Sequence, residues 1–180
     1  SPKSFNNKYG VPISLFNINK EDKIGIFEVG MDKKGEIDSL TKKIMPNVGI
    51  ITNISYAHIK NFKNLKGVAL AKAEIINNIV EHGSIILNAD DKFFKFFKYK
   101  SKKKKLRIIS FGIKNKSDVS LININKGKFN SVIYIKYNNK KLKFVIKKNL
   151  ENYIYNILST LAVISVYFDL EKLDKFFFND

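Results

Sequence analysis

The fold is decided by two neighbouring stretches of the sequence, Thr52-Asn53-Ile54-Ser55-Tyr56-Ala57-His58 and Gly67-Val68-Ala69-Leu70-Ala71-Lys72-Ala73-Glu74-Ile75-Ile76. The first stretch leaves an apolar run, Val48 to Ile51, which is typical of a buried strand. The second stretch has the periodicity of a helix. The sequence therefore predicts a strand, a polar loop and a helix in succession.

Lys72 is the residue of this helix that does not match its surroundings. At about 100° per residue, Lys72 falls within an apolar stripe, whereas Glu74 points nearly the opposite way. The stripe consists of Val68, Ile75, Ile76 and Ile79. A buried ammonium group is costly unless it meets an anion or is chemically changed. The alternative is a lysine that snorkels to solvent from the edge of the stripe.

Composition places the chain among globular domains. It has 180 residues, of which 44% are hydrophobic and 27% charged, so one domain with a real core is expected. The absence of cysteine excludes a disulfide framework and a Cys-based zinc site. We expect no membrane span, because no apolar run is long enough, and a cytoplasmic location, because no signal peptide is recognisable.

The net charge of +17 raises the alternative of a basic nucleic-acid-binding module. Lysine is spread along the whole chain, however, and arginine occurs only once, at Arg107. This distribution indicates a general drift in composition, so we expect no nucleic-acid partner. The densest run, Lys98 to Lys105, is expected to be a solvated loop.

The order of the elements predicts an α/β fold with a mostly parallel sheet flanked by helices. Residues 1–112 form the parallel part, with an extended piece at Ile13–Ile18 before it. The expected strands are Ile24–Gly30, Val48–Ile54, Ser84–Asn88 and Leu106–Phe111. Helices are expected from about Glu36 to Ile44, through the Lys72 stretch, and from Lys92 to Lys98, with Asp91 as the cap of the last one.

The pattern changes in residues 113–149, where apolar and polar residues alternate. Three segments with this period of two predict a small antiparallel meander at the edge of the main sheet. They are Val119–Asn125, Ser131–Tyr137 and Lys141–Lys147. Residues 150–180 are expected to be helical, with one helix from Asn152 to about Tyr167 and a shorter one after it.

Polar residues gather where the predicted strands end. In open α/β sheets, ligands bind at the carboxyl ends of the strands. Glu28, Thr52-Asn53 and Asn88-Ala89-Asp90-Asp91 lie at such ends, and His58 follows in the loop. A carboxylate and a histidine at one edge could hold a divalent metal. We therefore expect the side chains of Glu28, His58 and Lys72 to converge there.

Several short motifs occur together in a fixed order, and through them the chain resembles the central, ATP-binding domain of the Mur ligase family. The motifs are Ser4-Phe5-Asn6-Asn7 with Gly10-Val11-Pro12, Glu28-Val29-Gly30 with Gly35-Glu36-Ile37, Thr52-Asn53 with Ala57-His58, Ala71-Lys72-Ala73-Glu74, and Asn88-Ala89-Asp90-Asp91. The likeness covers almost the whole chain. The first motif favours the member that adds D-alanyl-D-alanine to a UDP-N-acetylmuramoyl-tripeptide over other Mur ligases and folylpolyglutamate-type ligases.

The resemblance implies the cofactors ATP and Mg²⁺ and a role for each site residue. Glu28 and His58 would be magnesium ligands, and Lys72 would carry a carbamate that adds a further carboxylate beside the metal. Asn156 would contact adenine, with Asn88, Asp90 and Asp91 near the nucleotide. The residues implied for substrate binding are Ser4, Asn6, Asn7, Thr52 and Asn53.

The resemblance also implies what lies outside the sequence. No phosphate-binding motif G-x-x-x-x-G-K-[ST] occurs in it. We therefore expect the phosphate loop to precede Ser1, and the UDP-binding and C-terminal domains of the enzyme to be missing. The 180 residues alone are expected to be inactive, with Lys72 unmodified.

Overall fold

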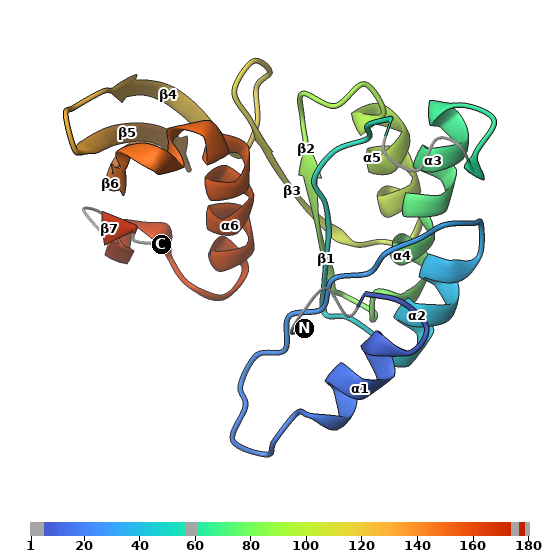
Figure 1. Cartoon of the computed structure of the whole chain (residues 1–180). Coiled ribbons are helices and arrows are strands. Elements are labelled where there is room, and N and C mark those ends of the chain that lie inside the picture. The colour runs from blue at the N-terminus through green and yellow to red at the C-terminus, as the bar shows by residue number, and fades with distance from the viewer. Residues whose placement is uncertain (1–5, 57–60, 174–176, 179–180) are drawn as a thin grey trace. The chain divides into compact units, whose positions relative to one another are not determined.

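A computed structural model describes residues 6–56, 61–173 and 177–178 of the chain, and Figure 1 shows their course. The chain divides into two compact units. The first unit consists of Ser1–Gly49 and Ile54–Gly83, and the second of Ile50–Asn53 and Ser84–Asp180.

The first unit is built on helices. They are α1 (Gly10–Phe16), α2 (Glu36–Ile44), α3 (Leu65–Lys72) and α4 (Glu74–Asn78). Helix α2 packs against the other three. A small core of Met31, Ile37, Val68 and Ala71 is covered by the partly buried side chains of Val29, Ile54, Phe62 and Ile75.

Helix α2 has the bounds that the sequence predicts. Its first turn carries Glu36 and Asp38 and its last turn carries Lys42 and Lys43. This arrangement complements the helix dipole, which favours negative charge at the N-terminus and positive charge at the C-terminus. The charges of the terminal turns thus favour the helix within the bounds that the sequence predicted.

Two expectations for the first unit are wrong. Ile24–Gly30 does not form a strand, and Ile24 and Ile26 are 62% and 81% exposed. An apolar run predicts a doubly buried strand only where layers of structure cover both of its faces, and these side chains lack such cover. Ile13–Ile18, expected to be extended, instead falls largely within α1, where Pro12 occupies the first turn that proline tolerates.

The expected Lys72 helix is present but broken. Helix α3 ends at Lys72, Ala73 forms a turn, and α4 begins at Glu74. The predicted stripe is confirmed, since Val68, Ile76 and Ile79 are buried and Ile75 is half-buried. The small residues Ala69, Ala71 and Ala73 are buried as well.

The second unit is built on a sheet. Among the described residues, seven strands follow the order β1-β2-β3-β4-β5-β6-β7. They are β1 (Val48–Ile51), β2 (Ser84–Asn88), β3 (Arg107–Gly112), β4 (Val119–Asn125), β5 (Asn130–Tyr137), β6 (Lys140–Lys147) and β7 (Phe177–Phe178). The pairs β2–β3, β3–β4 and β6–β7 are parallel, whereas β4–β5 and β5–β6 are antiparallel. The α/β class is confirmed, and the sheet is mixed.

Two helices pack on this sheet, α5 (Phe94–Lys103) and α6 (Ile154–Tyr167). Helix α6 contacts β2, β3 and β4, and α5 contacts β2 and β3, so the two helices lie on either side of these strands (Figure 1). The largest fully buried side chains of this unit include Ile85, Leu87, Phe97, Phe111, Phe144 and Leu158.

The antiparallel meander is confirmed, with β5 and β6 in continuous register from Asn130↔Lys147 to Tyr137↔Lys140. Helix α5 is longer than expected, and its lysines extend through Lys103 into the run predicted to be a loop. The last turn of α5 is stabilised by the burial of Phe97 and Ser101, and Lys104 N donates to Lys100 O at its end. At the C-terminal end, short 3₁₀ helices flank α6 at Lys148–Tyr153 and Leu170–Leu173, and β7 replaces part of the expected helical segment.

Within the described ranges, no helix combines the length and the apolar character that crossing a membrane requires.

Gly83 offers a test of the packing in the first unit. A Cβ at this position would lie 2.5 Å from Ile79 Cγ2, 2.8 Å from Asn47 O and 2.9 Å from Val80 O. Because two of these neighbours are backbone atoms, the Gly83→Ala variant must shift the chain, and we expect its free energy of unfolding to fall by about 2 kcal/mol. Urea unfolding measures the change.

Gly67→Ala is the matched control, because Gly67 lies inside α3 and its added Cβ would come no closer than 3.3 Å, to Phe62 Cβ. The higher helix propensity of alanine offsets that contact, so this variant should be at least as stable as the wild type. Equal stability of both variants would contradict the packing described here.

Candidate functional site

The predicted site residues are distributed over both units. The first unit holds Asn6, Asn7, Glu28 and Lys72, and the second holds Thr52, Asn53, Asn88, Asp90, Asp91 and Asn156. Ser4 and His58 lie outside the described residues, so the predicted convergence of Glu28, His58 and Lys72 stays a prediction.

Glu28 is exposed and lies in the extended segment before α2. Asn6 Nδ2 donates to Glu28 Oε1 over 2.9 Å, and Gly30 N donates to Asn6 O over 2.7 Å. The structure therefore brings together two predicted site residues that are 22 positions apart in the sequence.

The chemistry of Glu28 fits the expected magnesium ion. Carboxylate oxygens are preferred ligands of Mg²⁺, which is often held by one or two carboxylates together with substrate phosphates. The described part of the chain contains no group of three or more His, Cys, Asp or Glu residues suited to hold a metal ion. Glu28 offers an exposed carboxylate oxygen of this kind.

Asn7 has a different neighbourhood from Asn6. Its Oδ1 accepts from Tyr9 N and from Gly10 N, each over 3.0 Å, and its carbonyl accepts from Val11 N. The first N–H groups of a helix have no acceptor within the helix itself. Asn7 provides acceptors for them at the start of α1 and so caps that helix.

Lys72 ends helix α3 and is half-buried. This intermediate burial is compatible both with the predicted place of Lys72 within the apolar stripe and with the alternative of a lysine at its edge. The chain turns at Ala73 directly after it, and the next residue, Glu74, begins α4.

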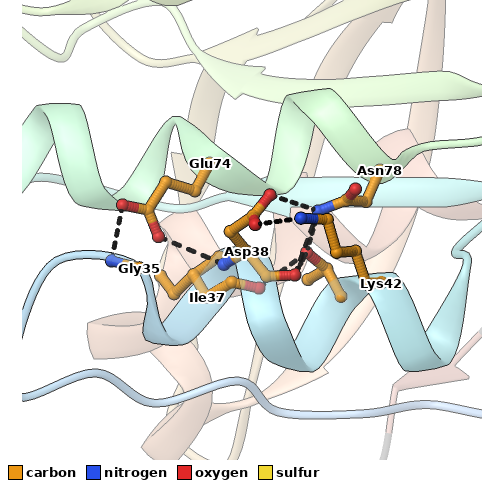
Figure 2. A network of polar contacts seen from close by, with 7 residues as sticks. Gly35, Ile37, Asp38, Lys42, Glu74 and Asn78 are labelled. Carbon is orange, nitrogen blue, oxygen red and sulfur yellow. Dashed lines mark hydrogen bonds and ion pairs between the residues drawn. The ribbon is translucent and has the colours of Figure 1, made fainter.

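Glu74 is a structural residue that the helical period placed wrongly. Instead of pointing away from the core it is half-buried, and Figure 2 shows its carboxylate at the start of α2. Gly35 N donates to Oε1 over 2.8 Å and Asp38 N donates to Oε2 over 3.1 Å. Both donors belong to the N-terminus of α2, where Gly35 adopts a φ of 90° that favours glycine. The break at Ala73 explains the error, because a continuous helix was assumed.

The network continues along the same two helices. Asn78 Nδ2 donates to Asp38 Oδ1 and to Thr41 Oγ1, over 3.0 and 2.9 Å, and Lys42 pairs with Asp38 over 2.7 Å. Lys42, and after it Asn78, holds the pKa of Asp38 below its ordinary value. The network thus holds α2 against α4 (Figure 2).

Removing the Glu74 carboxylate tests this network. The Glu74→Ala variant leaves two N–H groups at the start of α2 without their acceptor, so we expect a loss of about 2 kcal/mol in the free energy of unfolding. Glu74→Gln retains one acceptor oxygen and should lose about half as much. Chemical denaturation of the three proteins provides the comparison, and an alanine variant as stable as the wild type would show that Glu74 does not cap α2.

In the second unit, Asn88 connects the carboxyl ends of two strands. Its Nδ2 donates to Thr52 O over 3.0 Å, and its Oδ1 accepts from Asp90 N over 2.9 Å. The predicted gathering of Thr52 and Asn88 at one strand edge is therefore observed. Asp91 is nearby in the sequence, and its Oδ1 accepts from Phe93 N in the turn before α5.

Asp90 is the most connected of the predicted site residues. Its oxygens accept from the backbone N–H groups of Ile113, Lys114 and Asn115, at 2.6 to 3.2 Å. Tyr155 Oη also donates to Asp90 Oδ2, over 3.0 Å. Burial acts to raise the pKa of Asp90, but the hydrogen bonds together hold it below its ordinary value.

Tyr155 is a residue that sequence reasoning missed. It is half-buried at the start of α6, and burial, followed by the hydrogen bond to Asp90, raises its pKa. The next residue is Asn156, whose side chain is exposed. Asp90 thus holds the helix turn from which the predicted adenine contact extends. Its position directly before Asn156, the predicted adenine contact, was the one signal in the sequence that could have identified Tyr155.

Neutralising Asp90 should destabilise the chain in a pH-dependent way. At neutral pH an amide in place of this carboxylate loses several charge-assisted hydrogen bonds, so Asp90→Asn should reduce the free energy of unfolding by about 2 to 3 kcal/mol. A carboxyl group whose pKa is lowered by folding stabilises the protein above its unfolded pKa and loses that effect as the pH falls through its folded pKa. The difference between the two proteins should therefore shrink in acid.

Asp169→Asn is the control for this experiment, since the exposed carboxylate of Asp169 accepts from Glu171 N, and an amide oxygen can replace that acceptor. It should change stability by less than about 1 kcal/mol. Urea unfolding at several pH values measures the free energy of unfolding of each protein. A loss of stability in Asp90→Asn that does not depend on pH would contradict the role of the Asp90 charge.

Comparison with known proteins defines the class. Residues 1–164 match the family model of the Mur ligase middle domain. The chain therefore belongs to the Mur ligase family, as a middle domain. It is similar to the UDP-N-acetylmuramoyl-tripeptide--D-alanyl-D-alanine ligase of Buchnera aphidicola subsp. Baizongia pistaciae, with 38% identity over 122 residues, which are 68% of this chain and 26% of that protein.

Solved structures show the same likeness. MurF from Acinetobacter baumannii superposes with a TM-score of 0.85 at 27% identity, covering 95% of this chain and 37% of the other. The apo form of L. casei FPGS reaches 0.56 at 14% identity, over 80% of this chain and 35% of its own, and so shares the fold alone. The chain thus spans roughly a quarter to two fifths of the length of these proteins.

Proposed function

We propose that the chain is the central, ATP-binding part of a ligase that joins D-alanyl-D-alanine to a UDP-N-acetylmuramoyl-tripeptide during peptidoglycan synthesis in the cytoplasm. The observation that carries this proposal is the combined likeness, in sequence and in structure, to ligases of this type. The flanking domains of such an enzyme would bind the UDP group and help to bind the dipeptide.

The reaction would proceed in two balanced steps. The carboxylate of the tripeptide attacks the γ-phosphorus of ATP, giving an acyl phosphate and ADP. The amine of D-alanyl-D-alanine then attacks the acyl carbon, so that an amide forms and inorganic phosphate leaves. Enzymes of phosphoryl transfer work mainly by positioning and by stabilising charge on the transferred group.

The phosphate end of ATP would be bound with the help of Glu28, His58 and Lys72. Glu28 and His58 would hold Mg²⁺, which would neutralise charge on the phosphates when it is bound. Lys72, as a carbamate, would supply another carboxylate to the metal. Its half-buried position supports this role, because carbamylation removes a cation that burial disfavours.

The adenine end of ATP would be bound by Asn156. Asn156 is exposed on the first turn of α6 and offers both a donor and an acceptor to a base. Asp90, through Tyr155, would keep that turn in place. Asn88 and Asp91 would act mainly by shaping the strand ends, since both already make local hydrogen bonds.

The proposal is tested with the product of the complete reading frame that encodes this sequence. Phosphate release is measured with ATP, Mg²⁺, the UDP-linked tripeptide and D-alanyl-D-alanine, alongside a panel that replaces the dipeptide with single amino acids and the nucleotide substrate with a folate. We expect turnover with the dipeptide only. Lys72→Ala should lower kcat by about 100-fold or more, as expected when a group that stabilises the transition state is lost.

Asn78→Ala is the control for loss of stability, because it weakens the α2–α4 network without changing a proposed site residue. It should keep most of the activity at a temperature below its unfolding transition. Turnover with a folate or a single amino acid in place of D-alanyl-D-alanine would contradict the proposed substrate.

A further inference from the structure

We propose that Asn6 is a positioning residue for Glu28, which fixes the carboxylate for a divalent cation instead of contacting the peptide substrate. The inference rests on the proposed function, since it assigns the metal to Glu28. It differs from the sequence-based expectation, which placed Asn6 among the substrate-binding residues.

The first support is that Asn6 holds the Glu28 segment at two points. Its side-chain amide donates to Glu28 Oε1 over 2.9 Å. Its main-chain carbonyl accepts from Gly30 N over 2.7 Å. One residue thus fixes both the carboxylate and the backbone two positions further on. A carboxylate on an exposed extended segment would otherwise be free to rotate.

The second support is the close approach between Asn6 and Gly30. A Cβ added to Gly30 would lie 3.0 Å from Asn6 Cγ, 3.1 Å from Oδ1 and 3.2 Å from Nδ2. The amide plane therefore rests against the Gly30 backbone in space that a larger residue would fill. In this position the Asn6 amide directs one of its N–H donors to Glu28 Oε1.

The third support comes from the neighbouring asparagine. Asn7 directs its Oδ1 to the N–H groups of Tyr9 and Gly10 and so anchors the backbone at the start of α1. The two consecutive side chains therefore have separate tasks, one on α1 and one on Glu28. The anchored backbone in turn fixes the position from which Asn6 reaches Glu28.

An amide is chemically suited to this task. It donates a hydrogen bond to one carboxylate oxygen without adding a positive charge that would compete with the cation, and without the negative charge of an aspartate. Residues that orient a metal-binding carboxylate in this way typically contribute a factor of about 10 to 100 in metal affinity.

The test measures metal binding directly. The complete gene product is mixed with a non-hydrolysable ATP analogue, and Mn²⁺ binding is followed by electron paramagnetic resonance. Asn6→Ala should raise the Kd for Mn²⁺ by about 10- to 100-fold, and in assays of turnover it should raise the Mg²⁺ concentration for half-maximal rate while leaving the KM for the peptide substrate nearly unchanged. Gly30→Ala, which displaces the amide, should weaken Mn²⁺ binding in the same direction.

Asn78→Ala again serves as the matched control, because it removes an asparagine from the same unit without touching the Glu28 segment. Its Kd for Mn²⁺ should stay within about twofold of the wild type even though its thermal midpoint falls. Unchanged Mn²⁺ binding in Asn6→Ala, or a rise in the KM for the peptide substrate instead, would overturn the positioning role while leaving the proposed ligase intact. A wild-type protein that neither binds Mn²⁺ nor ligates would overturn both.

Discussion

Backbone N–H groups at the ends of strands and helices need acceptors, and in this chain a few polar side chains meet that requirement. Asp90 accepts from three successive N–H groups after β3, and Glu74 accepts from two at the start of α2. Each of these carboxylates connects segments that are distant in the sequence. Asp90 thus connects the loop after β3 with the start of α6, which carries Asn156, and Glu74 connects α4 with the start of α2.

This requirement separates the candidate site residues into two kinds. Glu28 and Asn156 are exposed, and their side chains can meet a ligand. Asn88 and Asp90 have side chains already engaged with the protein, and they hold neighbouring residues in place. Asn6 belongs with the second kind, because its amide donates a hydrogen bond to Glu28. A short sequence motif can thus contain two kinds of residue: those that can contact the ligand and those that hold their neighbours in place.

The sequence predicted best the elements whose signals are local. Gly35 before it and Pro46 after it located the helix Glu36–Ile44, and the period of two located the meander from Val119 to Lys147. It failed where the outcome depends on tertiary cover, as in Ile24–Gly30, since an apolar run looks alike with and without neighbouring layers. It also failed at Ala73, where a turn redirects Glu74 toward α2. For the site, motif order identified the residues, but pairings such as Asn6 with Glu28 depend on contacts across 22 positions that no local pattern encodes.

In the proposed ATP-dependent ligase, Glu28 is a magnesium ligand whose carboxylate is held by Asn6. A crystal structure of the complete gene product with Mg²⁺ and a non-hydrolysable ATP analogue tests it most directly. We expect a carboxylate oxygen of Glu28 at about 2.1 Å from the magnesium ion, with the Asn6 amide still donating to Glu28 Oε1. A magnesium ion bound without Glu28, or an Asn6 side chain turned away to bind the peptide substrate, would contradict it.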